Sequence, residues 1–162
     1  MVRTWAPKGR TPIVRYLSKQ DRLSAIRALA VSPTRRRVGL DLRLRRRNLT
    51  GVAVRAFLRH LLRHLRGPGV LLWDRGTIHR RQAVKQWITA HPRLHVEEFP
   101  AYAPELNPAE YVWAQTDRAL ANSAPMDLRQ LNGMLRSTGR RLRHSPRLLW
   151  SGISASDLPW VR

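Results

Sequence analysis

Hydrophobic and polar residues alternate over residues 38–44, with three leucines on one side and Asp41 and Arg43 on the other. This period of two predicts a strand with one buried face. The preceding run, Leu23 to Val31, is mostly apolar, and by pattern alone it fits either a strand or a helix. Ser32-Pro33-Thr34 and a basic turn, Arg35-Arg36-Arg37, separate the two segments. Two strands joined in this way would form a hairpin.

Apolar residues recur at steps of three and four from Val54 to Leu65. This spacing predicts an amphipathic helix that begins after Thr50, a suitable cap, and runs to Arg66. Gly67-Pro68-Gly69 ends the helix. The continuous apolar run that follows, Val70 to Trp73, predicts a buried central strand that ends at Asp74.

The second half of the chain continues the alternation of helix and strand. We expect a helix over about 79–91, a strand over 94–99, a proline-rich loop over 100–108, a helix after it and a last helix over 127–143. The order predicts an α/β fold in which an antiparallel hairpin precedes strands joined by helical crossovers. Residues 1–144 are expected to form one domain and residues 145–162, which show no clear period, a loosely held C-terminal tail.

The charge of the chain is extreme: 31 Lys and Arg against 10 Asp and Glu give a formal net charge of +21. Such an excess repels itself in a compact molecule unless a polyanion screens it, so DNA or RNA is the expected partner. The absence of cysteine excludes disulfides and thiolate metal sites. No apolar run is long enough to span a membrane, and we expect a soluble cytoplasmic protein.

Acidic residues are few, so the position of each is informative. Asp74 follows the most apolar strand, where carboxylates point into the ligand crevice of an α/β sheet. It could equally cap the turn that follows it. Glu110 is the third residue of a helix start, Asn107-Pro108-Ala109-Glu110, and taken alone this favours a helix cap over catalysis.

His60 and His64 have the spacing of two metal ligands on one helix, but they lie among Arg59 and Arg63. Positive charge disfavours a cation site there. We interpret this part of the helix as a solvated face.

Two stretches, VLLWDRGTIHR (70–80) and FPAYAPELNPAEYVW (99–113), closely resemble bacterial insertion-sequence transposases of the mariner superfamily, which carry a DDE superfamily endonuclease domain. The segment RTWAPKGRTP and the run DRLSAIRAL are also similar to that family, and the resemblance covers about residues 2–155. It implies an RNase H-like fold with a mixed sheet flanked by helices. The reaction it implies is metal-dependent cleavage and strand transfer of transposon-end DNA.

By this resemblance Asp74 would be the second metal-binding acid and Glu110 the third, with 35 residues between them. Two Mg²⁺ (or Mn²⁺) ions about 3.5–4 Å apart would stabilise the attacking and leaving oxygens, and they are expected only in the complete enzyme. His79 lies where the family carries a histidine, and it could orient Asp74 or contact phosphate. The residues expected to hold the DNA backbone are Arg75, His79, Arg80, Arg81 and Lys85.

The family's first catalytic aspartate precedes the RTWAP segment, and neither Asp21 nor Asp41 matches its position. The chain thus resembles an N-terminally truncated transposase that lacks the first strand, the first acid and the helix-turn-helix region. A frameshift product, a decayed insertion sequence or a misplaced start codon would each explain this. The resemblance implies transposon-end and target DNA, a possible upstream-encoded half and a homo-oligomer as partners, close to the nucleoid. We expect the isolated chain to be poorly soluble and to have little or no activity.

Two alternatives remain open. A non-catalytic basic nucleic-acid-binding protein needs only the charge of +21 and no acid triad. A nuclease on an RNase H-like fold is also compatible, although the PELNPAE motif favours a transposase.

Overall fold

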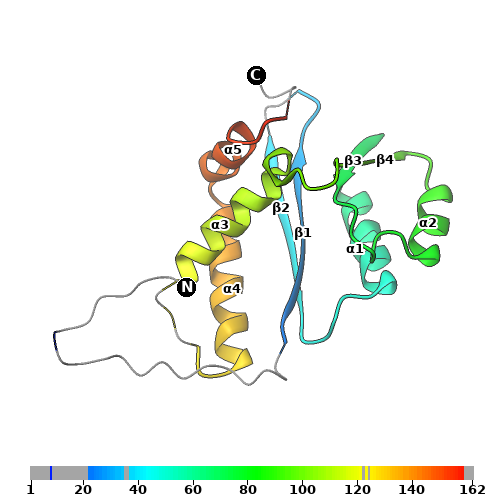
Figure 1. Cartoon of the computed structure of the whole chain (residues 1–162). Helices are drawn as coiled ribbons and strands as arrows, with labels where there is room; N and C mark the ends of the chain where they lie inside the picture. Colours follow the sequence, from blue (N-terminus) through cyan, green and yellow to red (C-terminus); the bar gives the residue numbers. More distant parts are fainter. Residues whose placement is uncertain (1–7, 9–21, 35–36, 122, 124, 159–162) are drawn as a thin grey trace.

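A computed structural model describes residues 8, 22–34, 37–121, 123 and 125–158. Its elements, in chain order, are β1 (Ser24–Val31), β2 (Val38–Arg45), α1 (Gly51–His64), β3 (Gly69–Trp73), α2 (Gln82–Thr89), β4 (Leu94–Glu98), a short 3₁₀ helix η1 (Pro104–Leu106), α3 (Pro108–Leu120), α4 (Leu128–Arg143) and α5 (Pro146–Ser154) (Figure 1). The α/β class, with an antiparallel hairpin followed by a parallel pair, is confirmed. Most of the RTWAP segment, Asp21 and two of the three turn arginines lie outside the described residues.

The hairpin of β1 and β2 is antiparallel, with Leu29 opposite Leu40 and Arg27 opposite Leu42. The segment whose pattern fitted either a strand or a helix is therefore a strand. Because successive side chains of a strand point to opposite faces, Ile26 and Ala28 pack toward α1, whereas Leu29 and Leu40 pack toward the C-terminal helices.

The second pair of strands, β3 and β4, is parallel and is joined through α2. Val84 and Trp87 of α2 are buried against Val54, Phe57 and the other apolar side chains of α1. The prediction that β3 is a buried central strand is wrong: its residues are half-buried or exposed, and Val70 keeps 67% of its surface. The physical reason is that β3 has only β4 as a neighbour among the described residues.

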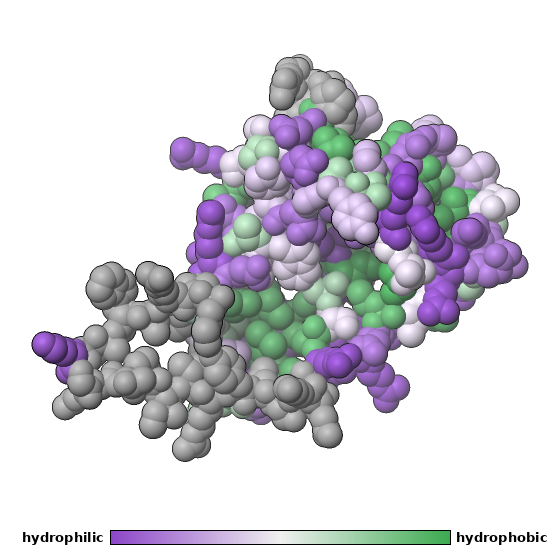
Figure 2. Space-filling view, in the orientation of Figure 1, coloured by the Kyte–Doolittle hydropathy of each residue, from purple (hydrophilic) through white to green (hydrophobic). Residues whose placement is uncertain are grey.

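The two strand pairs form separate two-stranded sheets. Helix α1 links them, because its buried face contacts Ile26 and Ala28 of β1 as well as Leu71 and Trp73 of β3. In Figure 1, α1 lies beside the hairpin on the side where β3 and β4 are drawn. The face shown in Figure 2 is hollowed near its centre, where hydrophobic residues gather between hydrophilic ones.

A second core lies on the other face of the hairpin. Leu40 of β2 meets one buried residue from each of three helices there, Val112 of α3, Leu142 of α4 and Leu149 of α5. Residues 145–158 are therefore not a loose tail, since Leu149 and Ile153 are fully buried. The hydrophobic pattern missed α5, a helix of nine residues whose burial depends on its contacts with β2, α3 and α4.

Two helices begin at residues whose side chains cap them, as their residue types favour. The Thr50 hydroxyl accepts a hydrogen bond from Ala53 N at the start of α1, and the Asp127 carboxylate accepts one from Gln130 N at the start of α4. Helix α2 is shorter than predicted, because residues 77–80 form a turn before it. No helix among the described residues is long and apolar enough to span a membrane.

Candidate active site

Asp74 lies directly after β3 and its carboxylate is two-thirds exposed. Its Oδ1 accepts a hydrogen bond from Gly76 N at 2.9 Å, which closes the turn of Asp74-Arg75-Gly76. The turn-capping interpretation is thus correct for this one oxygen. The other oxygen, Oδ2, makes no hydrogen bond within the described part of the chain and remains available for another ligand.

His79 holds the same carboxylate from a second direction. Its Nε2 lies 3.2 Å from Asp74 Oδ1, and its ring stacks on Trp73 with 4.3 Å between ring centroids. Burial lowers the pKa of His79 below its ordinary value, although the negative charges of Asp74 and Glu98 and the hydrogen bond to Asp74 act in the opposite direction. His79 is therefore neutral at pH 7, and the proton on Nε2 is donated to Asp74.

Gly76 is required by this packing. A Cβ atom at position 76 would lie 2.8 Å from Asp74 Oδ1 and 3.2 Å from the ring of His79. Any side chain there would displace the carboxylate, so the glycine allows Asp74 and His79 to meet over the turn.

Glu98 is a site residue that the sequence analysis missed. It ends β4 opposite Trp73 in the parallel register, so it lies beside the residue that precedes Asp74. Its Oε2 is 3.6 Å from both Arg75 Nε and Arg80 Nη2. The sequence predicted a strand over 94–99 that contains Glu98. Its proximity to Asp74, however, follows only from the register of that strand against residues 70–73.

An open cleft of about 280 Å³ adjoins this turn, and it is lined by Trp73, His79, Arg80, Lys85, Ile88, Thr89, Val96 and Glu98. It brings together three of the five residues expected to hold DNA, namely His79, Arg80 and Lys85. Arg75 forms an ion pair with Glu98, which also lines the cleft. Arg81 is an exposed residue that immediately precedes α2. Four of the five predicted DNA contacts thus lie in or beside this cleft, whereas the stem of Arg81 lies next to Gly51 of α1.

Glu110 lies on a different element, in the first turn of α3, and it is exposed. The Asn107 side chain caps this helix by accepting from Ala109 N at 3.0 Å. Asn107 N donates to the carbonyl of Pro104 rather than to Glu110, so the second half of a capping box does not form. The Glu110 carboxylate has no hydrogen-bond partner among the described residues, which leaves it free to bind a ligand.

The donor chemistry of these two acids suits a hard divalent cation, because carboxylate oxygens free of hydrogen bonds are the ligands that Mg²⁺ takes in proteins. The described residues contain no group of three or more His, Cys, Asp or Glu positioned to hold a metal ion. Asp74 and Glu110 each offer a carboxylate of the kind such a cation takes, but no contact joins the two acids among the described residues.

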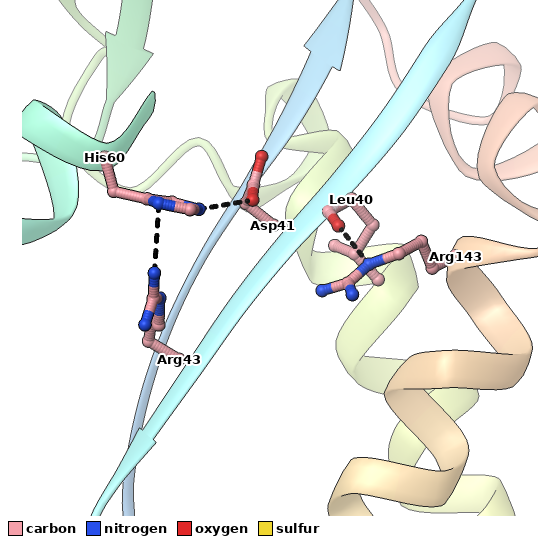
Figure 3. Close-up of polar contacts among 5 residues, drawn as sticks. All are labelled: Leu40, Asp41, Arg43, His60 and Arg143. Carbon is pink, nitrogen blue, oxygen red and sulfur yellow. Dashed lines mark hydrogen bonds and ion pairs between the residues drawn. The ribbon is translucent and has the colours of Figure 1, made fainter. Parts of the chain in front are cut away.

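Asp41, which does not match the position of the family's first catalytic aspartate, has a structural role. Its Oδ1 lies 3.2 Å from His60 Nε2, while His60 Nδ1 lies 3.0 Å from Arg43 Nη2 (Figure 3). His60 is thus a bridge between α1 and β2, and the interpretation of this histidine as a solvated residue is wrong. On the opposite face, Arg143 Nε donates to the carbonyl of Leu40 at 3.0 Å and ties α4 to the same strand.

Three kinds of comparison bear on the family. The crystal structure of the catalytic domain of Mos1 mariner transposase matches with a TM-score of 0.53 and 15% sequence identity, over 82% of this chain and 80% of that one. A simian T-cell lymphotropic virus intasome in complex with PP2A regulatory subunit B56 gamma matches with a TM-score of 0.49 and 11% identity, over 86% of this chain and 55% of that one. A search of curated proteins found no match.

The likeness to the Mos1 domain shows a shared fold. The model of the DDE superfamily endonuclease family matches residues 2–132, which is most of the chain and includes both Asp74 and Glu110. The chain belongs to the DDE superfamily endonucleases.

Proposed function

We propose that this chain is the catalytic domain of a DNA transposase of the insertion-sequence type, in which Asp74 and Glu110 bind the catalytic divalent metal ions. The observation that carries the proposal is the state of the two carboxylates: Asp74 is held at a strand end by Gly76 and His79 with one oxygen free, and Glu110 stands unpaired at a helix start. A bound Mg²⁺ or Mn²⁺ would supply Lewis-acid stabilisation of the phosphodiester oxygens during cleavage and strand transfer.

In this proposal the protein's own side chains position the acids and the DNA. His79 acts as a neutral donor that fixes the orientation of Asp74, in the manner of residues that orient metal ligands from behind. Arg75, Arg80, Arg81 and Lys85 bind the phosphate backbone of transposon ends and target. The ion pairs of Arg75 and Arg80 with Glu98 are long and solvent-exposed, so both arginines can exchange Glu98 for phosphate at little cost.

We propose further that a strand between β1 and β3 completes the site and supplies another acid. Among the described residues β1 bonds only to β2 and β3 only to β4, so each has a free edge, and both pack on α1. All eight residues of β1 are only half-buried, although helices cover both faces of the hairpin. A segment encoded upstream, in the same chain or in a separate half, is the proposed source of this strand.

The test is metal-dependent cleavage of a labelled transposon end. The DNA upstream of the Met1 codon should be translated in all frames, and the joined product expressed beside the chain as given. We expect the joined product to cut DNA in Mg²⁺ or Mn²⁺ and the chain alone to show little or no cutting. Asp74→Asn and Glu110→Gln should each abolish cutting, while Glu97→Gln, an exposed acid of β4, should not.

Cleavage that survives both Asp74→Asn and Glu110→Gln would refute the assignment of the metal ligands. Cleavage by the chain alone, equal to that by the joined product, would refute the need for another strand.

A non-catalytic nucleic-acid-binding protein is the second candidate, and the net charge of +21 favours it. DNA affinity in the presence and absence of Mn²⁺ separates the two proposals. A pure binder should keep or gain affinity in Asp74→Ala, since the variant removes a negative charge, and should show no metal dependence. A transposase domain should bind DNA more tightly with Mn²⁺ and lose that increment in Asp74→Ala. In either case we propose a protein of the bacterial cytoplasm that acts on nucleoid DNA, and a homo-oligomer when two transposon ends are joined.

A further inference from the structure

Arg27 is a charged residue on a face of β1 that is otherwise apolar. It stands opposite Leu42 in the hairpin, and its side chain shares a small enclosed space with Leu42, Val112 and Leu142. A leucine or valine at this position would satisfy the packing of a strand against helices, so packing alone does not account for an arginine.

The guanidinium of Arg27 is directed at the first turn of α3. Its Nη2 donates a hydrogen bond to the carbonyl of Ala109, the residue before Glu110. Its Cζ lies 3.8 Å from the centroid of the Trp113 ring, so the planar group stacks on the indole. Ala109 and Trp113 are one helical turn apart on α3, and a single side chain therefore holds both ends of the turn that carries Glu110.

The charge of Arg27 acts on the same turn. Burial lowers the pKa of Arg27 to about 9, and the negative charges of Glu110 and Asp117 partly offset this effect. The side chain is thus cationic at neutral pH, and it faces one acid at the start of α3 and another further along it. Its Nε is buried without a hydrogen-bond partner in the described part of the chain, which adds to the free-energy cost of keeping the arginine there.

We infer that Arg27 is a positioning residue of the active site, which fixes the first turn of α3 against β1 and thereby sets the place of the Glu110 carboxylate. The inference rests on the proposed function in so far as Glu110 binds metal. It also explains the tryptophan of the motif: Trp113 is the platform on which the positioning side chain stacks. Gly152 of α5 packs against the same turn of α3, because a Cβ at this position would lie 3.2 Å from Tyr111 Cβ.

The test compares Arg27→Met and Arg27→Lys with Val112→Ala in the full chain. Methionine keeps the length and apolar stem of arginine without its charge or fork, whereas lysine keeps the charge and loses the planar stack. Val112 is buried on the same helix and lines the same enclosed space as Arg27, so its truncation weakens the packing of α3 but removes neither the hydrogen bond to Ala109 O nor the stack on Trp113. Two quantities are measured for each variant: amide hydrogen exchange over residues 109–113, and the dissociation constant for Mn²⁺ followed by electron paramagnetic resonance.

We expect Arg27→Met to speed exchange over residues 109–113 by about tenfold while exchange in α1 stays unchanged. Its Mn²⁺ dissociation constant should rise by about tenfold, as for other residues that orient a metal ligand. Arg27→Lys should recover part of both effects. Val112→Ala should lower the melting temperature at least as much as Arg27→Met and leave Mn²⁺ binding within about twofold of the original chain.

Wild-type exchange and Mn²⁺ binding in Arg27→Met would overturn the inference. So would an equal loss of Mn²⁺ affinity in Val112→Ala, because Arg27 would then contribute only stability. Should Arg27→Met not fold, Arg27→Lys decides by the same two measurements. If Glu110→Gln leaves Mn²⁺ binding unchanged, the metal assignment of the proposed function fails, and the exchange data still decide whether Arg27 fixes the turn.

Discussion

The carboxylate of Asp74 has one oxygen that the protein uses and one that it leaves free. Gly76 N and His79 Nε2 both bind Oδ1, so the turn fixes the direction of Oδ2 without occupying it. The carboxylate is therefore oriented before anything binds to it, which reduces the conformational entropy lost on binding. If Asp74 binds metal as proposed, the residues around it contribute to that binding although they donate no atom to the metal.

Gly76→Ala tests this orientation. The new Cβ would stand 2.8 Å from Asp74 Oδ1, and the carboxylate, the more mobile of the two groups, would have to rotate away. Because the turn is near the surface, we expect the melting temperature to change little. Mn²⁺ affinity should fall by about tenfold, as measured by paramagnetic resonance. Wild-type affinity in Gly76→Ala would show that the hydrogen bond in the turn has no part in metal binding.

The depressed pKa of His79 has a consequence for stability in metal-free buffer. The unfolded chain takes up a proton on this histidine as the pH falls below 6.5, whereas the folded chain does not until the pH is lower. The unfolded state then binds more protons, so the free energy of unfolding should decrease as the pH drops below 6.5. His79→Gln should reduce this slope in urea titrations with EDTA. His95→Gln, which removes an exposed histidine, is the control and should keep the slope.

The family resemblance singled out Asp74, Glu110 and His79, the last of which contacts Asp74, but Glu98 and Arg27 were not predicted. Asp74 and Glu110 stand at element boundaries, where position along the chain indicates a role. Glu98 and Arg27 act through strand register and through a contact between β1 and α3, respectively, and neither is visible before the elements are placed in space. Arg27 in particular looks in the sequence like an interruption of an apolar run.

At the scale of elements, α5 has the largest unforeseen role. Its residues Leu149 and Ile153 are fully buried, and Gly152 lets its backbone approach Tyr111 in the first turn of α3. The last helix thus supports the turn that carries Glu110. Helix α1 was predictable because its apolar positions recur over several turns, whereas the role of α5 depends on contacts with β2, α3 and α4 that are distant in the sequence.

Truncation of Leu149 measures this contribution. Leu149→Ala removes a side chain that is buried among β2, α3 and α4, and we expect a loss of about 2–4 kcal/mol in the free energy of unfolding. Leu148→Ala is the matched control, because Leu148 is only partly buried at the edge of the same cluster. Its cost should be clearly smaller in the same urea titration. Equal costs would indicate that α5 is held loosely.

At the scale of the whole molecule, β1 and β3 each have one edge without a neighbouring strand among the described residues, and such an edge can pair with another chain. Figure 2 shows hydrophobic residues gathered on a surface that also carries many hydrophilic ones. The net charge of +21 opposes association between copies, but counterions and nucleic acid screen that repulsion. The separation of the two sheets could not be predicted, because the hydrophobic pattern of a strand does not identify the strands that pair with it.

Val70→Lys tests whether the edge of β3 drives association. Val70 is 67% exposed on this strand, and lysine on an edge strand disfavours pairing with another strand. We expect more monomer in sedimentation velocity and a larger soluble fraction on expression. Val52→Lys places the same charge at an equally exposed valine, 61%, in the first turn of α1. An equal gain from both variants would assign the effect to charge alone.

The division into two cores also separates the two acids. Asp74 follows a strand that packs with α1 and α2, whereas Glu110 begins a helix whose Val112 belongs to the core of α3, α4 and α5. Each acid is thus anchored to a different core. The separation between the two carboxylates is therefore set by how the two cores pack on the hairpin and α1, so a substitution in either core can change that separation without touching an acid.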